Sequence, residues 1–342
     1  MQQRNSGLLL AATIVIVAVA IFALARGERG VSPAAPGARA FPDLGSRLGD
    51  LAWVRLSRGS AKADFAAIGG RWVLVGKGNY PAAPDKMRRL LLGLADLSLV
   101  EPKTARPELF ARLDLDDPGN GKSTLVALKD RGGKTIAELV VGKVRHDRLG
   151  GGNDSVFVRK PGDNRAWLAR GSLGLPGDAA GDSIGWLDRR ILDIAGSRIA
   201  GVALTGGDGL ELVLRRDIPG GKFAVADPPP DVRLKGPVVL AEPAAALAGL
   251  DLDDVKPAAE VPVPQVGVAS AIFTSFDGLT VTLRLFAHDN ADWVAIEASG
   301  GGAADTQVIN TKLAQWRYAI PAGRAKLLRT RLADLVEPAK GS

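Results

Sequence analysis

Hydrophobic residues form one long uninterrupted run at 7–25, in which Thr13 carries the only polar side chain. A helix of this length rises about 29 Å at about 1.5 Å per residue, close to the ~30 Å hydrocarbon thickness of a bilayer. The run therefore predicts an N-terminal transmembrane helix. A cleaved secretory signal peptide is the alternative, since Ala23-Leu24-Ala25 has the small-x-small pattern of a cleavage site.

After this run, short stretches of alternating apolar and polar residues predict β-strands separated by turns that contain Gly or Pro. In the first half of the chain we expect strands at 51–56, 63–68, 71–75, 124–128, 135–141, 155–159 and 166–169. A helix is predicted from Pro84, which suits a first helical turn, and Asp85 suits the N-terminal end of the helix dipole. Its apolar positions recur at helical spacing: Met87, Leu90, Leu91, Leu94 and Leu97.

The pattern restarts near residue 196. Strands are predicted at 199–204, 210–215, 222–225, 279–286 and 293–297, with a small helix around 242–249 and a C-terminal helix from about 322 to 336. Gly220-Gly221 repeats Gly69-Gly70, and the pentapeptide Leu-Asp-Leu-Asp-Asp occurs at 113–117 and again at 250–254. These similarities predict an internal duplication.

The expected fold class is α+β: an N-terminal transmembrane helix followed by short-stranded antiparallel sheets with a few covering helices, in two similar tandem units. Four segments are expected along the chain. They are a cytoplasmic head and transmembrane anchor at 1–29, a linker at 30–42, a first α+β unit at 43–195 and a second α+β unit with the C-terminal helix at 196–342. The linker contains three prolines and no hydrophobic periodicity.

The charge and the cysteine content of the chain indicate which partners and which cellular compartment to expect. The net charge is +7, from 44 Lys+Arg against 37 Asp+Glu, but basic residues cluster only in pairs and aromatic residues make up 5% of the chain. Nucleic-acid-binding proteins concentrate their basic residues in patches, so no nucleic-acid partner is expected. The chain has no cysteine, which fits a body exposed to an oxidising compartment. The predicted location is the inner (plasma) membrane, single-pass, with the body in the periplasm or extracytoplasmic space.

The sequence predicts no catalytic residue, no cofactor and no metal site. The stretch 118–124 ends like a phosphate-binding loop, but the motif needs Gly where Asp116 stands, and a strand rather than a helix is expected to follow. A turn is the preferred interpretation. The Asp-rich stretches at 113–117 and 250–254 lack the Gly and the distal Glu of a calcium loop, and their acids are expected to face water beside buried leucines.

The other residues that could bind a metal ion, an anion or a sugar are interpreted as structural. The chain has two histidines, His146 and His288, and no cysteine to complete a zinc site, so both are predicted to be loop residues, as are the glycines 150–152. The aromatic residues on strands and at element ends are predicted to be core and rim residues rather than a sugar-binding platform. They are Trp53, Trp72, Tyr80, Trp293, Trp316 and Tyr318.

Several segments together resemble a bacterial family of unknown function, whose members have one N-terminal transmembrane helix and a β-rich extracytoplasmic region. The matching segments are 71–72 leading to 80–82, the leucine-rich helix at 87–97, 140–142, 186–192 and 316–321. Genes of this family often lie beside those of gliding-motility or auxiliary-type ABC transporters. The resemblance therefore implies an envelope location near an ABC permease, and it supplies no catalytic residues.

The expected function is a membrane-anchored, non-enzymatic accessory or binding subunit of an envelope ABC-type transport system. The membrane and an ABC-transporter permease or another envelope protein are the expected partners, and the ligand is unidentified. One alternative is an envelope hydrolase with two carboxyl groups ~5–10 Å apart in one cleft. Another is a bitopic scaffold of a secretion or pilus assembly.

Overall fold

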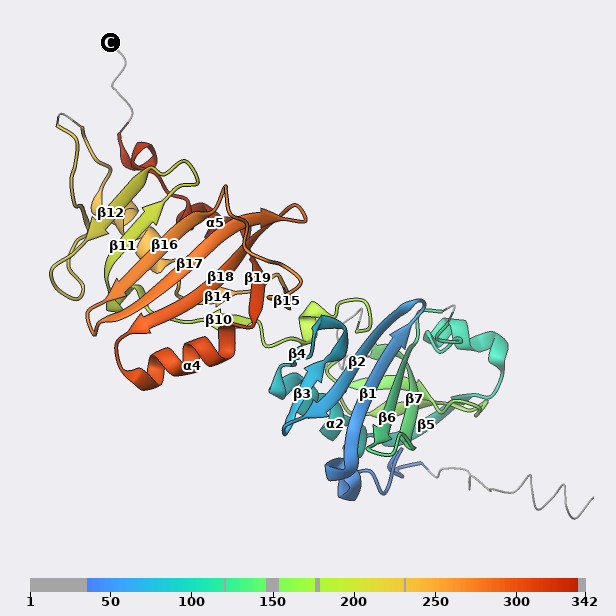
Figure 1. The fold of residues 1–342 in the computed structure, drawn as a ribbon. Helices are drawn as coiled ribbons and strands as arrows, with labels where there is room; N and C mark the ends of the chain where they lie inside the picture. The colour runs from blue at the N-terminus through green and yellow to red at the C-terminus, as the bar shows by residue number, and fades with distance from the viewer. Residues whose placement is uncertain (1–35, 120, 146–153, 176–178, 231, 338–342) are drawn as a thin grey trace, which may run out of the picture.

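Two curved antiparallel β-sheets, one in each half of the chain, form the computed structural model (Figure 1). The structure describes residues 36–119, 121–145, 154–175, 179–230 and 232–337. The first sheet lies in the lower right lobe of Figure 1 and the second in the upper left lobe.

The first sheet has nine strands in the order β4-β3-β2-β1-β6-β7-β8-β9-β5. Their bounds are β1 Leu51–Arg58, β2 Ala61–Ile68, β3 Arg71–Leu74, β4 Tyr80–Pro81, β5 Ser98–Thr104, β6 Thr124–Asp130, β7 Thr135–Arg145, β8 Ser155–Arg159 and β9 Ala166–Arg170. Successive side chains of a strand point to opposite faces. In β1, Val54 and Leu56 are therefore buried while Trp53 and Arg55 are exposed on the outer face.

The helix α2 (Pro84–Asp96) packs against the inner face of this sheet, as its periodicity predicted. Met87, Leu90 and Leu94 are almost wholly buried and share one hydrophobic core with the inward residues of β1 and β2. The helix begins at Pro84 as expected, because proline at the first helical position loses no hydrogen bond.

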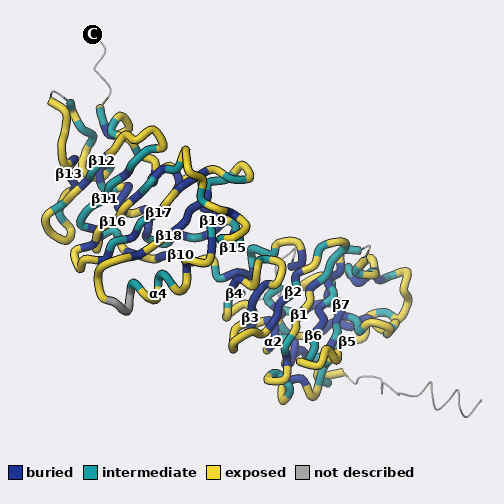
Figure 2. The backbone as a smooth tube through the Cα atoms, in the orientation of Figure 1, coloured by how far each residue is buried: buried dark blue, intermediate teal, exposed yellow. Residues whose placement is uncertain are grey.

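The second sheet has eight strands in the order β13-β12-β11-β16-β17-β18-β19-β15. Their bounds are β11 Ile199–Thr205, β12 Glu211–Arg215, β13 Ala224–Val225, β15 Asp254–Pro257, β16 Ala269–Ser275, β17 Leu279–His288, β18 Ala291–Gly300 and β19 Trp316–Ile320. Its helices are α3 (Pro237–Ala241), α4 (Ala303–Leu313) and α5 (Ala322–Leu328). Buried residues alternate with exposed or partly exposed ones along β8 of the first sheet and along β16 and β17 of the second (Figure 2).

Apart from β4, the two sheets have the same strand order. The strands β1, β2 and β3 correspond to β11, β12 and β13, the strands β6 to β9 correspond to β16 to β19, and β5 corresponds to β15. The register shifts at the same place in both sheets: between Leu51 and Trp53 where β1 pairs with β6, and between Ile199 and Gly201 where β11 pairs with β16. A β-bulge is a specific local feature, so its recurrence makes the two halves two copies of one topology.

The two repeated sequence motifs, the glycine pair and the pentapeptide, differ in whether their two copies occupy equivalent positions in the two sheets. The glycine pairs lie between the second and third strands of both sheets, although φ is positive at both Gly69 and Gly70 of the first pair and only at Gly220 of the second. The pentapeptide Leu-Asp-Leu-Asp-Asp instead lies between β5 and β6 in the first copy, and runs from β14 (Leu250–Asp251) into β15 in the second. It does not occupy equivalent positions, so only the glycine pairs reflect the shared topology.

The predicted fold class requires correction. No helix in the part of the chain that the structure describes is long and apolar enough to cross a membrane, so the transmembrane helix of the predicted fold is not supported. The run at 7–25 that suggested it lies outside the described residues. The strands are also less short than predicted, since β7 has 11 residues and β17 and β18 have 10 each.

Two further expectations differ from the structure. The end of the predicted linker is tied to β5 and to the residue before it, since the Gly37 amide donates to the Leu99 carbonyl and the Ala40 amide to the Leu97 carbonyl. The predicted C-terminal helix is interrupted: α5 ends at Leu328, and a separate 3-10 helix follows at Leu332–Leu335. The Asp334 carboxylate accepts a hydrogen bond from the Arg331 amide at 2.9 Å and so starts this new turn.

Candidate functional site: the ribbon at the junction of the two sheets

A two-stranded ribbon lies where the chain passes from the first sheet to the second. The strand β10 (Arg190–Leu192) pairs antiparallel with β14, so that residues 190–192 lie beside 250–251. Leu250 and Leu252 are fully buried, while the acids between and after them face outward. This alternation is the period of two expected of a strand, and it places the carboxylates where the two arginines of the ribbon can reach them.

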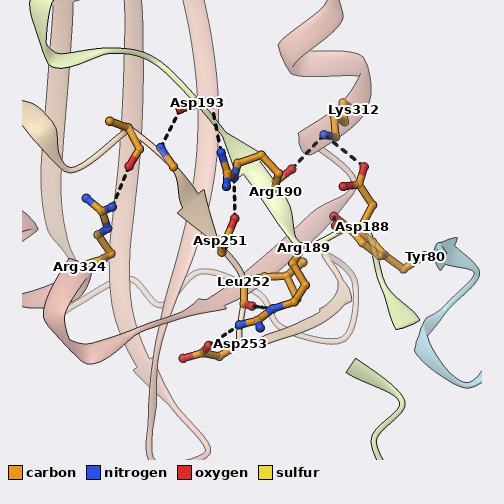
Figure 3. A network of polar contacts seen from close by, with 12 residues as sticks. Tyr80, Asp188, Arg189, Arg190, Asp193, Asp251, Leu252, Asp253, Lys312 and Arg324 are labelled. Carbon is orange, nitrogen blue, oxygen red and sulfur yellow. Dashed lines mark hydrogen bonds and ion pairs between the residues drawn. The ribbon is translucent and has the colours of Figure 1, made fainter. Parts of the chain in front are cut away.

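Arg189 and Arg190, next to each other at the start of β10, both reach across to the β14 segment and hold the ribbon together (Figure 3). Arg190 Nε donates to Asp251 Oδ1 at 2.6 Å, and its Nη1 lies 3.2 Å from Asp193. Arg189 Nε donates to the Leu252 carbonyl at 2.9 Å, and its Nη2 donates to Asp253 at 3.1 Å. The hydrogen bond from Arg190 to Asp251 raises the pKa of the Arg190 guanidinium, which therefore stays charged.

Side chains from α4 and α5 attach to the same ribbon. Lys312 of α4 donates to the Arg190 carbonyl at 3.0 Å and lies 3.9 Å from an Asp188 oxygen. Arg324 of α5 donates to the Ala248 carbonyl at 2.7 Å. Figure 3 shows these side chains converging on β10 and β14 from two sides. The C-terminal helices are thus fixed to the centre of the molecule by polar contacts.

Tyr80 carries the contact between the sheets. Its hydroxyl donates to the Asp188 carbonyl at 3.2 Å, and its ring meets the rings of Trp316 and Tyr318 edge-on at 5.0 and 6.2 Å between centroids. Burial raises the pKa of both tyrosines, so they remain neutral. Beside them Lys77 donates to Asp254 at 2.6 Å, which adds an ion pair across the same junction.

A pocket of about 380 Å³, here called the α4 pocket, opens between α4 and β10. Its apolar lining comes from β10 and the residues after it, from the start of β17 and from α4: Ile191, Leu192, Ile194, Leu279, Val308, Ile309 and Leu313. Its cations are Arg190, Arg198 and Lys312. A second pocket of about 360 Å³ adjoins the ribbon beside α5, between Arg189 and Arg324. The ribbon therefore forms part of the wall of two cavities.

Each cation of the α4 pocket already has a partner. Arg190 is paired with Asp251 and Lys312 with the Arg190 carbonyl, and Arg198 Nη2 donates to Asp277 at 2.5 Å. The Ser275 hydroxyl and Arg198 together lower the pKa of Asp277 to about 2. This carboxyl group is therefore ionised at neutral pH and has no proton to donate.

The residues considered as ligands from the sequence lie elsewhere. Pro118 and Gly119 lie in a turn, the Gly121 amide donates to the Asp117 carbonyl at 2.9 Å, and β6 begins at Thr124. A strand rather than a helix thus follows this segment, as the sequence predicted. His288 lies 3.2 Å from the Asp289 carboxylate, whereas His146 and the glycines 150–152 lie outside the described residues. Across the described ranges no three His, Asp or Glu side chains gather where they could hold a metal ion.

Comparison with known families accounts for the middle of the chain. A domain of unknown function, DUF4340, matches residues 72–263, which is more than half of the 342 residues. The chain belongs to the DUF4340 family. The matched segment includes both strands of the ribbon, whereas α4 and α5 follow it. No curated protein and no solved structure is significantly similar to this chain.

The sequence indicates both halves of the ribbon but not their pairing. The segment 186–192 is part of the family resemblance, and the pentapeptide at 250–254 is one of the sequence repeats. In the DUF4340 domain the two pair with each other across about 60 positions. The available signal was complementary charge, since adjacent arginines in one segment face alternating acids in the other. Paired strands with opposite charges attract, but sequence alone does not say which of many acidic segments is the partner.

Proposed function

We propose that this DUF4340 protein is a non-enzymatic accessory or binding subunit of an envelope ABC-type transport system, and that it holds a partner in the α4 pocket. The composition of that pocket carries the proposal. Its lining is mostly apolar, and its cations are paired with groups of the same chain. Pockets of this kind bind by shape and desolvation, with few polar groups to set orientation.

The state of the carboxyl groups favours binding over hydrolysis. A glycosidase-type hydrolase needs one carboxyl group whose pKa is raised, so that it can donate a proton. Among the described residues, the carboxyl groups with a clearly shifted pKa are Asp277 and Asp289, and both are lowered. Both owe this to hydrogen bonds, from Ser275 and Arg198 in one case and from Lys256 in the other.

The rim of the pocket indicates an apolar contact from a protein partner. Val308 of α4 lines the pocket and is 66% exposed, next to the partly buried Ile309. An extracytoplasmic segment of an ABC permease that inserts one or two apolar side chains would cover both. The extracytoplasmic location rests on the family resemblance and on the lack of cysteine in the sequence.

A photo-crosslinking amino acid placed at Val308 in cells tests this proposal. The matched control is Val266, which is 83% exposed and does not line the pocket. We expect an adduct with an ABC permease subunit, identified by mass spectrometry, from position 308 and not from 266. The variant Val308→Asp should also lose co-purification of that subunit, while Val266→Asp keeps it. Equal adducts from both positions, or none with a permease from 308, would contradict the proposal.

A further inference from the structure

The outer face of the first sheet carries a third cavity, here called the Trp53 pocket, of about 230 Å³. It is lined by residues of β1, β2 and β6 and by the turn after β6: Trp53, Val54, Arg55, Asp64, Ala127, Lys129 and Gly133. Trp53 is 43% exposed, unlike the buried Tyr80, Trp293, Trp316 and Tyr318. Trp53 therefore lies at the surface and not in the core.

Strand register brings the polar groups of this pocket together. Arg55 lies opposite Asp64 on β2 and opposite Ala127 on β6, and Trp53 lies opposite Lys129. Arg55 Nε and Nη2 donate to the two Asp64 oxygens at 2.5 and 2.9 Å, which fixes both side chains in one plane. Lys129 makes no ion pair with any described residue, so one positive charge in the pocket is uncompensated.

The second sheet shows that the fold does not require these side chains. Because the strand order and the bulge are shared, register assigns an equivalent in the second sheet to the pocket residues that lie on strands. The equivalents of Trp53, Arg55, Asp64, Lys129 and Ala127 are, in that order, Gly201, Ala203, Val213, Thr274 and Ile272. The same topology thus forms with the larger side chain of isoleucine in place of Ala127, and without the indole or the Arg–Asp ion pair. The requirements of the fold therefore do not explain an exposed indole beside a fixed Arg–Asp pair.

We propose that the Trp53 pocket binds a single sugar ring that carries a carboxylate. The exposed indole face offers a flat apolar surface for the C–H face of a pyranose. The Arg55–Asp64 pair offers a donor and an acceptor side by side, which matches hydroxyl groups because they both donate and accept. Lys129 supplies the charge that a carboxylate on the ring needs, and the small floor at Ala127 leaves room for the ring. This site is separate from the α4 pocket and does not depend on the proposed transport role.

Calorimetric titration of the full chain with a glucuronate-containing tetrasaccharide, and with cellotetraose as the neutral counterpart, tests the proposal. We expect measurable binding of the acidic sugar and binding of the neutral sugar that is about tenfold weaker. Trp53→Ala and Ala127→Ile should each weaken binding of the acidic sugar at least about tenfold. Lys129→Met should remove the preference for the acidic sugar and leave weak binding of both.

Two controls separate a lost site from a lost fold. Ala127→Ile introduces the residue found at the equivalent position of the second sheet, so the thermal unfolding temperature should change little. Arg284→Ala breaks an exposed ion pair with Glu297 in the second sheet and should leave sugar binding unchanged. The proposal would be overturned if neither sugar bound. An equal loss in Arg284→Ala, or tighter binding of adenosine monophosphate than of the acidic sugar, would also overturn it.

Discussion

Asp277 is a residue whose ionisation depends on its neighbours. Its carboxylate accepts a hydrogen bond from the Ser275 hydroxyl and another from Arg198, which lower its pKa from 3.8 to about 2. A group whose pKa is lowered by folding contributes stability above its unfolded pKa, and that contribution is lost as the pH falls through the folded value. The contribution of Asp277 should therefore decline between about pH 4 and pH 2.

Removal of the serine hydroxyl tests this assignment. In Ser275→Ala we expect the pKa of Asp277 to rise towards 3.8, because the largest stabilising contact of the charged form is gone. Carbon-detected NMR titration of the Asp277 carboxyl group measures it directly. Arg284→Ala, which changes a distant ion pair, should leave the titration as in the parent. An unchanged value in Ser275→Ala would show that the hydroxyl does not act on Asp277.

Gly78 is the residue at which the backbone of the junction is most constrained. It has φ of 63°, and a Cβ added there would lie 2.4 Å from Pro257 of the second sheet. Gly59 has a similar φ of 56° with open space around it. Gly59→Ala should cost about 1–2 kcal/mol from backbone strain alone, and Gly78→Ala should cost more because it also forces the sheets apart. Urea unfolding of both variants measures the difference, and equal losses would contradict a close contact at Gly78.

At the scale of elements, the ribbon should depend on its leucines more than on its ion pairs. Leu252 is fully buried, so Leu252→Ala should lower the free energy of unfolding by about 2–5 kcal/mol. Asp253 and Arg189 are about half exposed, and pairs of this kind contribute about 0–1 kcal/mol. Asp253→Ala should therefore change little, and Leu210→Ala, at an exposed leucine, serves as the control. A larger loss of unfolding free energy in Asp253→Ala than in Leu252→Ala, measured by urea unfolding, would contradict this prediction.

The elements that the sequence predicted are those whose pattern is local. The helix α2 and the strand β8 were predicted with nearly correct limits, because one carries a helical apolar stripe and the other alternates between turns. The helix α4 was missed because its sequence shows no apolar stripe and its contacts are with β18 and the ribbon. The strand β16 lacked clear alternation in its small and polar residues, and its place is fixed by β11 and β17 on either side.

The sites were less predictable than the elements. The α4 pocket and the Trp53 pocket both form where segments distant in sequence become neighbours in the sheets. Trp53 alternates with buried Val54 and so was recognisable as outward-facing, yet its partners Asp64 and Lys129 depend on strand register. Register in turn depends on the bulge near Leu51, and no local sequence pattern predicts that bulge.

At the scale of the whole molecule, the two sheets share one continuous hydrophobic core rather than two separate ones. Side chains of α2, the ribbon and the second sheet belong to the same cluster, and Tyr80 links β4 to β19 through Trp316 and Tyr318. A continuous core couples the unfolding of its parts, because exposing one part also exposes apolar surface of the other. The two sheets should therefore unfold together, in a single calorimetric transition, although each has a complete topology of its own.

Truncation of Tyr80 should uncouple them. Tyr80→Ala removes the ring that lies 5.0 Å from Trp316 and the hydroxyl that bonds to the Asp188 carbonyl, and leaves a cavity at the junction. We expect differential scanning calorimetry to show two transitions in this variant. Tyr80→Phe keeps the ring and loses one hydrogen bond, which costs about 1 kcal/mol, so its single transition should only shift to lower temperature. Two transitions in the parent protein would mean that the junction is too weak to couple the sheets, and a single transition in Tyr80→Ala would mean that the ribbon alone is enough to join them.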